Sequence, residues 1–422
     1  MSSIAFADVV HQTIYFSREV KSEALALDLM ETKWFQRLRD ISQTGNTSLV
    51  YMFMEHSRFG HCVGVAYLAN HLMNRLAQAD SAEVEEYRCA VSAAAVLHDI
   101  GHIAPGSHSA YRTWYPGCED CHEQLAIRVI KEDPQIASVL NSYGEGLIEQ
   151  VAQILSEQRD LPPWTWEIIS GGGWNVDRGN WCIVDSVMAG VTYGRYNIPA
   201  LLESMVITPD KHLALKENRR DAMMHFGIAR HSMYRQVYQH RVFLASETLN
   251  RSIVQRARDL GKNLCFADTH ARAVLDSDSP GDLALHNLFA MRESWWRYHL
   301  SRWAEDPDSI LHDLARRLLS RDLLKTVRIQ PQDDARSLRE AAKKAVTQAG
   351  FDPLYYLHEV SPSNMHACEA ENSMMVLMEN GDLFPLGRAE PLWNAMVEES
   401  KNPRHAWLVM PAEAKRLLGR ER

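Results

Sequence analysis

The stretch Ala93-Ala94-Ala95-Val96-Leu97-His98-Asp99-Ile100-Gly101-His102 is a run of small and apolar residues that ends in adjacent histidine and aspartate. Its first half predicts the end of a buried helix. An imidazole beside a carboxylate is costly to bury there unless a charged group satisfies both side chains. A divalent cation would do so, and His98 and His102, four residues apart, are expected to face one side of the same helical turn. The stretch therefore predicts a buried metal site.

Two other segments carry the same kinds of side chain and each opens a predicted helix. The first is His56-Ser57-Arg58-Phe59-Gly60-His61, which offers two imidazoles and a guanidinium; the second is Cys121-His122-Glu123-Gln124. Imidazole nitrogens combined with carboxylate oxygens make a donor set of intermediate softness, which suits Mn, Fe, Zn or Ni, or Mg with more retained water. Three such segments on successive helices favour a metal site over an ordinary helix cap.

Around these segments the pattern is mainly helical from residue 35 to about residue 260, because apolar residues recur at spacings of three and four. The best predicted helical stretches are residues 62–76, 87–97, 124–130 and 221–260. Residues 9–16 predict a short hairpin. The polar residues 262–282 predict a linker or loop, and residues 283–324 predict further helices in which Trp295, Trp296, Leu314 and Leu318 pack.

The last ninety residues differ in character from the rest. Residues 373–377, then Asn380-Gly381, then Leu383-Phe384 predict a strand, a turn and a second strand, and residues 406–410 predict another strand. These patterns indicate a small mixed α/β region at the C-terminal end of the chain.

Composition narrows the class of protein. The 422 residues are 46% apolar and 23% charged, with a formal net charge of −9, which is typical of a globular protein. The acidic balance argues mildly against a nucleic-acid coat, although nucleic acid as a partner stays open. We see no apolar run long enough to span a bilayer and no signal-peptide pattern. Seven scattered cysteines indicate a reducing compartment, so we expect a cytoplasmic protein with no membrane partner.

Six segments, taken in order, resemble the motifs of the HD-domain phosphohydrolase superfamily and, within it, of the deoxynucleoside triphosphate triphosphohydrolases, which include the SAM-and-HD-domain enzyme. They are Trp34-Phe35-Gln36-Arg37-Leu38-Arg39-Asp40-Ile41-Ser42-Gln43-Thr44-Gly45, Arg58-Phe59-Gly60-His61-Cys62-Val63-Gly64-Val65, His98-Asp99-Ile100-Gly101-His102, His122-Glu123-Gln124, Asn175-Val176-Asp177-Arg178-Gly179-Asn180-Trp181-Cys182-Ile183-Val184-Asp185 and Arg230-His231-Ser232-Met233-Tyr234-Arg235-Gln236-Val237-Tyr238-Gln239-His240. The resemblance covers roughly residues 8–260. It implies a mainly α fold with an HD-domain helical core and a small α/β C-terminal appendage.

The sequence patterns predict a division of the chain, and the resemblance implies a ligand set. The expected parts are a catalytic core over residues 1–265, a helical extension over 266–330 and the mixed α/β region over 331–422. The implied ligands of a divalent ion (Mn, Mg, Fe, Ni or Zn) are His61, His98, Asp99 and Asp177. An ungapped match of the fifth segment makes Asp177 the ligand and places Asp185 at the sugar 3′-hydroxyl. Asp185 as the ligand is the second choice.

The activity implied by the resemblance is hydrolysis of deoxynucleoside triphosphates to deoxynucleoside and tripolyphosphate. The implied catalytic residues are His102, His108, His122 and Glu123, since an imidazole near neutral pH can take up or release a proton. The implied substrate contacts are Gln43, Arg58, Arg178, Asp185, Arg230, Tyr238 and Gln239. The arginines would bind phosphate oxygens, and the Tyr238 ring would exclude a 2′-hydroxyl.

Regulation and assembly are also implied. Gln36 and Arg39 match positions near regulatory nucleotide sites in some relatives, which makes a nucleotide activator a candidate partner. We further expect a homo-oligomer, with exposed tryptophans at Trp295, Trp296 and Trp407 contributing to an interface.

The chain departs from the family pattern in ways that leave the substrate and the cleavage position open. Asn180, Trp181 and Val184 replace the usual Asp, Tyr and Arg, which predicts an altered sugar side of the pocket. Tyr111 stands where an acidic partner is expected after His108. An HD-domain phosphatase or phosphodiesterase that acts on nucleoside mono- or diphosphates or on a signalling nucleotide is the alternative. A non-enzymatic module that binds nucleotide or nucleic acid is a third reading.

The segment Cys118-Glu119-Asp120-Cys121-His122 fits two further patterns, a haem attachment site and half of a zinc knuckle. Haem is normally attached outside the cytoplasm, and no second Cys-x-x-Cys pair occurs in the chain. A zinc knuckle built from Cys118, Cys121 and a further pair stays a minor alternative.

Overall fold

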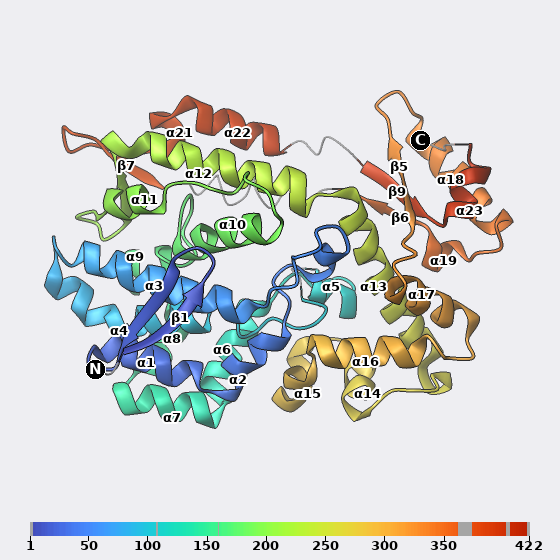
Figure 1. The fold of residues 1–422 in the computed structure, drawn as a ribbon, viewed down its shortest axis with the longest axis horizontal. Helices are drawn as coiled ribbons and strands as arrows, with labels where there is room; N and C mark the ends of the chain where they lie inside the picture. The colour runs from blue at the N-terminus through green and yellow to red at the C-terminus, as the bar shows by residue number, and fades with distance from the viewer. Residues whose placement is uncertain (1–2, 107–108, 159, 362–373, 402–405, 420–422) are drawn as a thin grey trace.

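The computed structural model describes residues 3–106, 109–158, 160–361, 374–401 and 406–419, and these residues form a mainly helical fold with three small sheets (Figure 1). The mainly α fold with a small mixed C-terminal region is confirmed. At the N-terminus, β1 (Ser3–Asp8) pairs antiparallel with β2 (Gln12–Ser17). The predicted hairpin therefore exists but begins earlier than residue 9. Its turn is fixed by the Asp8 carboxylate, which accepts hydrogen bonds from the backbone N–H groups of Val10 and His11.

Helix α4 (Ser81–Leu97) lies at the centre of the core. It is packed by α1 (Lys21–Met30), α3 (Arg58–Leu76) and α8 (Leu147–Leu155), and every residue from 90 to 97 is buried. The alanines at 93–95 carry small side chains, so neighbouring helices can approach α4 on several sides. The helix ends at Leu97, which delivers His98 and Asp99 into the middle of the fold.

Further short helices complete the core around α4. They are α2 (Lys33–Arg37), α5 (Ala110–Trp114), α6 (His122–Glu132), α7 (Pro134–Tyr143), α9 (Trp164–Glu167), α10 (Val176–Met188) and α11 (Ile198–Ser204). Helix α10 packs on α3, and its first turn is capped by the Asn175 side chain, which accepts a hydrogen bond from the Arg178 N–H. This cap fixes where Asp177 enters the core.

The predicted helical stretch 221–260 is divided in two. Helix α12 (Arg220–Met233) passes into a π-helical turn over residues 234–238, and α13 (Arg241–Leu260) follows. The His240 ring accepts a hydrogen bond from the Val242 N–H and so starts α13 as a new helix. Single π-helical turns are frequent at functional sites, and this turn carries Tyr238.

The prediction of a linker over residues 262–282 is wrong in part. Helix α14 (Thr269–Asp276) lies inside this segment, because the Asp268 carboxylate caps its N-terminus by accepting from the Ala271 N–H at 2.7 Å. The helices predicted beyond residue 283 are present as α15 (Leu285–Ala290), α16 (Glu293–Trp303) and α17 (Ser309–Leu319). Leu314 and Leu318 are buried as expected.

The prediction that Trp296 is a packing residue is confirmed, whereas the prediction that it is exposed at an interface is wrong. Trp296 is buried, with 2% of its surface exposed, and it packs edge-on against Trp114 and Trp303. Trp295 and Trp407 are partly buried. Trp296 therefore belongs to the interior and offers no interface, because the apolar spacing along α16 faces the core.

The C-terminal strands occur where they were predicted, but they join two different sheets. Strand β7 (Met375–Leu377) and β8 (Leu383–Pro385) form the predicted hairpin, and β7 also pairs in parallel with β4 (Leu213–Lys216), whose other neighbour is β3 (Met205–Ile207). Helices α21 (Leu386–Ala389) and α22 (Pro391–Lys401) follow, and α22 packs on α12. This part of the C-terminal region thus lies against the helical core.

The second C-terminal sheet has β9 (Ala406–Met410) at its centre, antiparallel to β5 (Lys325–Ile329) and β6 (His358–Val360). It is packed by α13, α18 (Ala335–Gln348) and α23 (Ala412–Leu417), and α19 (Pro353–Tyr356) packs on α13 and α18. The domain boundaries at residues 265 and 330 stay a prediction.

Arg37 ties the helical extension to the core. Its guanidinium is buried and donates to the carbonyls of His102 at 2.7 Å, Met291 at 2.9 Å, Phe289 at 3.0 Å and Leu288 at 3.1 Å. Burial lowers the pKa of Arg37 to about 9. Because a forked cation satisfies four carbonyls at once, the loop that carries His102 is fixed to the segment that precedes α16.

The stability of the fold is expected to depend on pH through His358 in β6, which donates through Nε2 to the Tyr355 carbonyl at 3.0 Å. Burial, aided by the charge of Arg251, lowers the pKa of His358 to about 4. An unfolded histidine titrates near pH 6.5, so stability is lost as the pH falls from about 6.5 towards 4. At pH 5 the loss from this group is about 2 kcal/mol.

Urea unfolding at pH 7 and pH 5 measures this effect by comparing the wild type with His358→Gln, which cannot titrate. Between the two pH values we expect the wild type to lose about 2 kcal/mol more than the variant. Equal losses would show that His358 does not carry this pH dependence.

Candidate functional site

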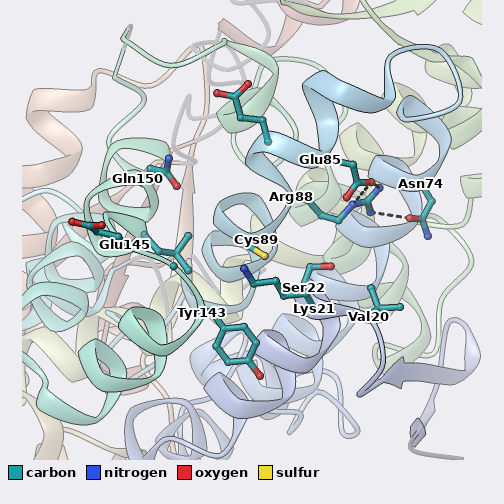
Figure 2. A pocket seen from close by; sticks show the side chains of 13 residues that line it. Val20, Lys21, Ser22, Asn74, Glu85, Arg88, Cys89, Tyr143, Glu145 and Gln150 are labelled. Carbon is teal, nitrogen blue, oxygen red and sulfur yellow. Dashed lines mark hydrogen bonds and ion pairs between the residues drawn. The ribbon is translucent and has the colours of Figure 1, made fainter.

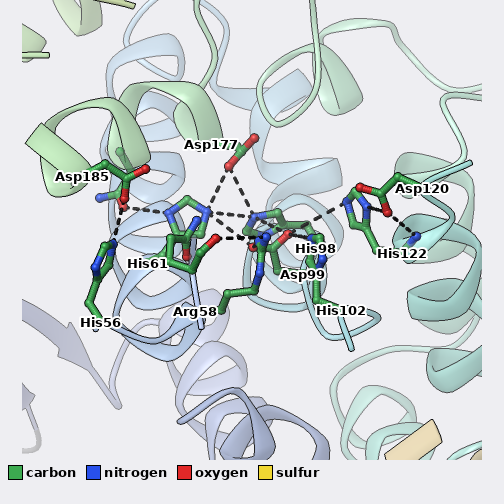
Figure 3. A network of polar contacts seen from close by, with 12 residues as sticks. His56, Arg58, His61, His98, Asp99, His102, Asp120, His122, Asp177 and Asp185 are labelled. Atoms are coloured by element: carbon green, nitrogen blue, oxygen red, sulfur yellow. Dashed lines mark hydrogen bonds and ion pairs between the residues drawn. The ribbon is translucent and has the colours of Figure 1, made fainter. Parts of the chain in front are cut away.

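The side chains at the end of α4 meet those of α3 and α10 in a buried cluster (Figure 3). His61 Nε2 lies 3.0 Å from Asp177 Oδ1 and 3.4 Å from His98 Nε2. His98 Nε2 lies 3.6 Å from Asp99 Oδ1 and 3.7 Å from Asp177 Oδ1. His61 and Asp99 are almost fully buried. His61 and His98 each lie within 3.7 Å of both carboxylates. His61, His98 and Asp177 are placed so that they could hold one metal ion, whereas Asp99 belongs to two other such groups, one with Cys62 and His98 and one with His102 and His122.

A hydrogen bond to Asn180 fixes the orientation of the His61 ring. Its Nδ1 lies 3.0 Å from Asn180 Oδ1, so the ring donates to the amide and keeps Nε2 directed at the cluster. Gly64 makes room for this contact, because a Cβ there would lie 2.3 Å from Asn180 Nδ2. Asn180, predicted to alter the sugar side of the pocket, therefore contacts a predicted metal ligand instead.

His102 and His122 lie on the other side of Asp99. The four-residue spacing from His98 predicted that His102 lies on the same helix. The structure shows that His102 lies on the loop after α4 instead. Its Nε2 is 3.2 Å from Asp99 Oδ1, and its ring stacks on that of His122 at 4.0 Å and 17°. His122, the first residue of α6, has its Nδ1 2.9 Å from Asp120 Oδ1. Gly101 permits this arrangement, because a Cβ there would lie 1.9 Å from the His122 carbonyl oxygen.

Asp185 lies further along α10 than Asp177 and accepts two hydrogen bonds from other elements. His56 Nε2 is 2.7 Å from its Oδ1 (Figure 3). The Tyr238 hydroxyl donates to its Oδ2. No metal-competent group in the described part of the chain includes Asp185. The geometry thus separates Asp185 from the histidine cluster and does not favour it as a ligand.

The predicted arginines occupy three different places. Arg58 donates to Asp99 Oδ2 and approaches the Gln43 carbonyl, so it neutralises a buried carboxylate. Arg178 donates to the carbonyls of Gly171 and Ser170. Arg230 is buried, with its guanidinium 5.3 Å from the Tyr234 ring and 6.0 Å from the Trp181 ring.

The other predicted residues are placed as follows. Gln43 is buried beside this cluster, and its side-chain Oε1 has no hydrogen-bond partner among the described residues. Glu123 is exposed on α6, and Gln239 is partly buried after the π-helical turn. Arg39 donates to Gln36 Oε1 and stacks at 3.5 Å on the Phe59 ring. His108 lies outside the described residues.

The charge states in the cluster follow from its contacts. Burial alone would raise the pKa of Asp99, but Arg58 and the imidazoles of His98 and His102 hold it well below its usual range. Burial alone would also raise the pKa of Asp177, but hydrogen bonds from His61 and His98 hold this pKa below its usual range. Burial and the nearby Arg58 hold the pKa of His102 well below its usual value. The carboxylates are therefore ionised, and His102 is a neutral imidazole at neutral pH.

Two alternative sites find no support. Three groups of donors in the described residues could share a metal ion: His61 with His98 and Asp177, Cys62 with His98 and Asp99, and Asp99 with His102 and His122. None of these groups contains Cys118 or Cys121. A separate open pocket of about 520 Å³ (Figure 2) mixes Lys21 and Arg88 with Glu85, Glu86 and Glu145. Because Arg88 is already paired with Glu85, this pocket offers no strong charge of one sign.

The comparison with known families matches the HD domain to residues 58–189, a range that runs from Arg58 past Asp185. Residues 58–189 are an HD domain. The chain therefore contains an HD domain, as its motifs indicated, and it is similar to the branch that contains the deoxynucleoside triphosphate triphosphohydrolase SAMHD1. None of the described helices is both long enough and apolar enough to cross a membrane.

Relatives of known sequence resemble different lengths of this HD-domain chain. The Bacillus subtilis protein YwfO is 29% identical over 91% of this chain and 87% of its own length. The SAMHD1 homologue of Dictyostelium discoideum is 33% identical over 31% of this chain, and SAMHD1 of Gallus gallus is 24% identical over 60%. The matches cover 26% and 45% of those two enzymes, which is less than half of each.

Solved structures share the fold over nearly the whole chain. A phosphohydrolase from Bacteroides thetaiotaomicron superposes with a TM-score of 0.81 at 23% identity, covering 96% of this chain and 99% of its own. A hypothetical protein from Aquifex aeolicus superposes with a TM-score of 0.72 at 20% identity, and the match covers both chains completely. The likeness therefore extends beyond the HD domain to the C-terminal region.

Proposed function

We propose that this HD-domain protein is a metal-dependent phosphohydrolase that converts deoxynucleoside triphosphates into deoxynucleoside and tripolyphosphate. The supporting observation is the convergence of His61, His98, Asp99 and Asp177, whose facing nitrogen and oxygen atoms lie 3.0 to 3.7 Å apart. Atoms that share a metal ion at about 2.1 Å lie roughly 3.0 to 3.4 Å from one another, so small side-chain movements would suffice.

The four ligands fit a divalent ion because they combine two imidazoles with two carboxylates. When bound, the ion supplies Lewis-acid polarisation of a phosphoryl oxygen and neutralisation of developing charge. Arg58 balances the charge of Asp99, and Asn180 orients His61. Mn, Mg, Fe, Ni and Zn remain the candidate ions.

The reaction proposed for this site begins with attack of water on the α-phosphorus, in line with the bond to the sugar O5′. The new P–O bond forms as the P–O5′ bond breaks, so tripolyphosphate keeps the water oxygen and the deoxynucleoside leaves. His102 and His122 are our candidates for taking the proton from water and delivering one to O5′, because both lie beside Asp99. His108 and Glu123 are proposed to assist them.

The substrate contacts are proposed from the family resemblance. We assign Arg58, Arg178 and Arg230 to phosphate oxygens, and Gln43, Asp185, Tyr238 and Gln239 to the sugar and base. The hydroxyl of Tyr238 and the ring of His56 hold the Asp185 carboxylate from two sides, which orients it for a sugar hydroxyl. A nucleotide activator near Gln36 and Arg39, and assembly into a homo-oligomer, stay predictions.

Asn180→Ala is expected to weaken metal binding by about 10- to 100-fold, because His61 loses the partner that fixes its tautomer and ring orientation. Equilibrium dialysis with Mn(II) measures the dissociation constant. Asn70→Ala, which removes a buried amide further along α3, serves as the matched control and should leave the constant unchanged. Identical affinities for Asn180→Ala and the wild type would contradict the role given to Asn180.

The substrate is tested by incubating the purified chain with dNTPs, NTPs, NDPs and NMPs in the presence of Mn(II) or Mg(II), followed by anion-exchange chromatography of the products. We expect deoxynucleoside and tripolyphosphate from dNTPs. Turnover of monophosphates alone, or release of orthophosphate alone, would contradict the proposal and favour an HD-domain phosphatase. No turnover of any nucleotide would favour a binding module.

A further inference from the structure

The first residue of α16, Glu293, connects two loops of the helical core through its side chain. Its Oε1 accepts a hydrogen bond from the Gly106 N–H at 2.5 Å, and its carboxylate also accepts the Ser42 N–H. The three residues are closely packed, since a Cβ at Gly106 would lie 2.4 Å from the Ser42 carbonyl oxygen and 2.9 Å from Glu293 Oε1. One side chain of the helical extension therefore bridges two loops that are far apart in the sequence.

Both loops lead into the candidate site. The loop that ends at Gly106 begins after α4 and carries His102, a candidate for proton transfer. Ser42 forms an isolated β-bridge with Ser57, which directly precedes α3. The next residue, Gln43, is a proposed substrate contact. The bridge therefore connects a proposed substrate contact with a proposed proton-transferring imidazole.

We infer that Glu293 is a positioning residue for the proposed hydrolysis, because its carboxylate holds the loop of Ser42 and Gln43 at a fixed distance from the loop of His102. The inference rests on the proposed function and adds to it a residue that acts through the two loops. Glu293 lies outside residues 58–189, the range matched to the HD domain. The helical extension thus contributes to the geometry of the site.

Neighbouring contacts hold the start of α16 against the core. The Ala104 N–H donates to the Met291 carbonyl at 3.0 Å. The Ser294 N–H donates to Asp40 Oδ1 at 3.1 Å, and the Ser294 hydroxyl donates to Oδ2 of the same carboxylate. Because these contacts fix the helix end, the length of the Glu293 side chain determines how closely the two loops approach each other.

The ordinary role of an acidic residue in the first turn of a helix is interaction with the helix dipole, which needs its charge and not an exact reach. The environment of Glu293 asks for more than this. Burial of its carboxylate raises its pKa, and the N–H groups of Gly106 and Ser42 act against that rise. Hydrogen bonds from backbone N–H groups to a carboxylate are among the stronger ones in proteins, so two of them can hold two loops.

Three variants of the full chain separate the reach of the side chain from its charge. Glu293→Gln keeps the length and an acceptor oxygen, whereas Glu293→Asp keeps the charge and withdraws the oxygens by one methylene. We expect kcat for dATP to fall by about 10- to 100-fold in Glu293→Asp and Glu293→Ala, because small displacements in catalytic sites have effects of this size. Glu293→Gln should recover most of the rate. The Mn(II) dissociation constant should stay unchanged in all three.

Hydrogen–deuterium exchange, measured by mass spectrometry of peptides, tests the bridge without any substrate. Peptides that cover residues 39–45 and 100–106 should exchange faster in Glu293→Ala and Glu293→Asp than in the wild type. Asp268→Ala is the matched control, since Asp268 caps α14 in the same extension and accepts from Trp295 Nε1 at 2.9 Å. We expect this control to lose stability, to keep its kcat per folded molecule and to leave the exchange of both loops unchanged.

The outcomes separate this inference from the proposed function. A full rate in Glu293→Asp with a reduced rate in Glu293→Gln would show that the residue acts through its charge, and would overturn the inference. Unchanged exchange of both loops in Glu293→Ala would overturn it as well. A wild type that turns over no dNTP but shows the expected exchange pattern would overturn the proposed function and leave the bridge intact. If Glu293→Ala does not fold, the comparison of Glu293→Gln with Glu293→Asp decides the question.

Discussion

Asp99→Ala is expected to lower the rate of dNTP hydrolysis by at least about 10⁴-fold, which corresponds to about 5.5 kcal/mol of lost transition-state stabilisation. Asp99 contacts Arg58 and lies within 4.0 Å of four imidazoles, so its removal takes a carboxylate from the proposed metal site and leaves a buried guanidinium without its partner. Initial rates with saturating dATP and Mn(II) measure the effect.

Asp306→Ala is the matched control for this change. Asp306 is also buried, but it caps a turn in the helical extension by accepting hydrogen bonds from the backbone of Cys265 and Asp308. We expect this variant to lose stability and to keep its rate per folded molecule. A rate for Asp99→Ala within tenfold of the wild type would contradict the role proposed for Asp99.

Gly101→Ala has the second largest expected effect. A Cβ at Gly101 would lie 1.9 Å from the His122 carbonyl oxygen and 2.7 Å from the Ala126 nitrogen, and both are backbone atoms of α6. Helix α6 must move away, and His122 moves with it. We expect the rate to fall by about 100-fold, because an ångström of misplacement has that effect in catalytic sites. The free energy of unfolding should fall by about 1 to 3 kcal/mol.

Gly144→Ala is the matched control, since nothing lies within 4 Å of a Cβ at that position and its backbone is extended. Rates and urea unfolding of both variants give the comparison. Wild-type activity in Gly101→Ala would show that the close approach of α6 to the loop after α4 does not position His122.

The core of the candidate site was predictable because its chemistry is local in the sequence. A histidine and an aspartate at the end of an alanine-rich helix are costly to bury, so the sequence alone indicates that a charged group satisfies them. The grouping of His61, His98, Asp99 and Asp177 came from the family resemblance, and the structure places all four together. The position of His102 was wrong in detail, because the helix ends at Leu97 and the loop beyond it carries that ring.

The surroundings of the site were less predictable because they depend on contacts between distant segments. His56 reaches Asp185 across 129 residues, Asn180 reaches His61 across 119, and Arg37 holds carbonyls more than 250 residues away. No local pattern records such pairings. The helices followed from apolar periodicity, whereas α14 was missed because its polar surroundings resemble a loop. The parallel pairing of β4 with β7 joins strands far apart in sequence, which short-range patterns cannot specify.

The most direct test of the central claim is hydrolysis of dATP in water enriched in ¹⁸O, with mass spectrometry of both products. Attack at the α-phosphorus predicts one ¹⁸O atom in tripolyphosphate and none in deoxyadenosine. Label in orthophosphate or pyrophosphate, accompanied by deoxyadenosine di- or monophosphate, or label in the nucleoside itself, would contradict the account.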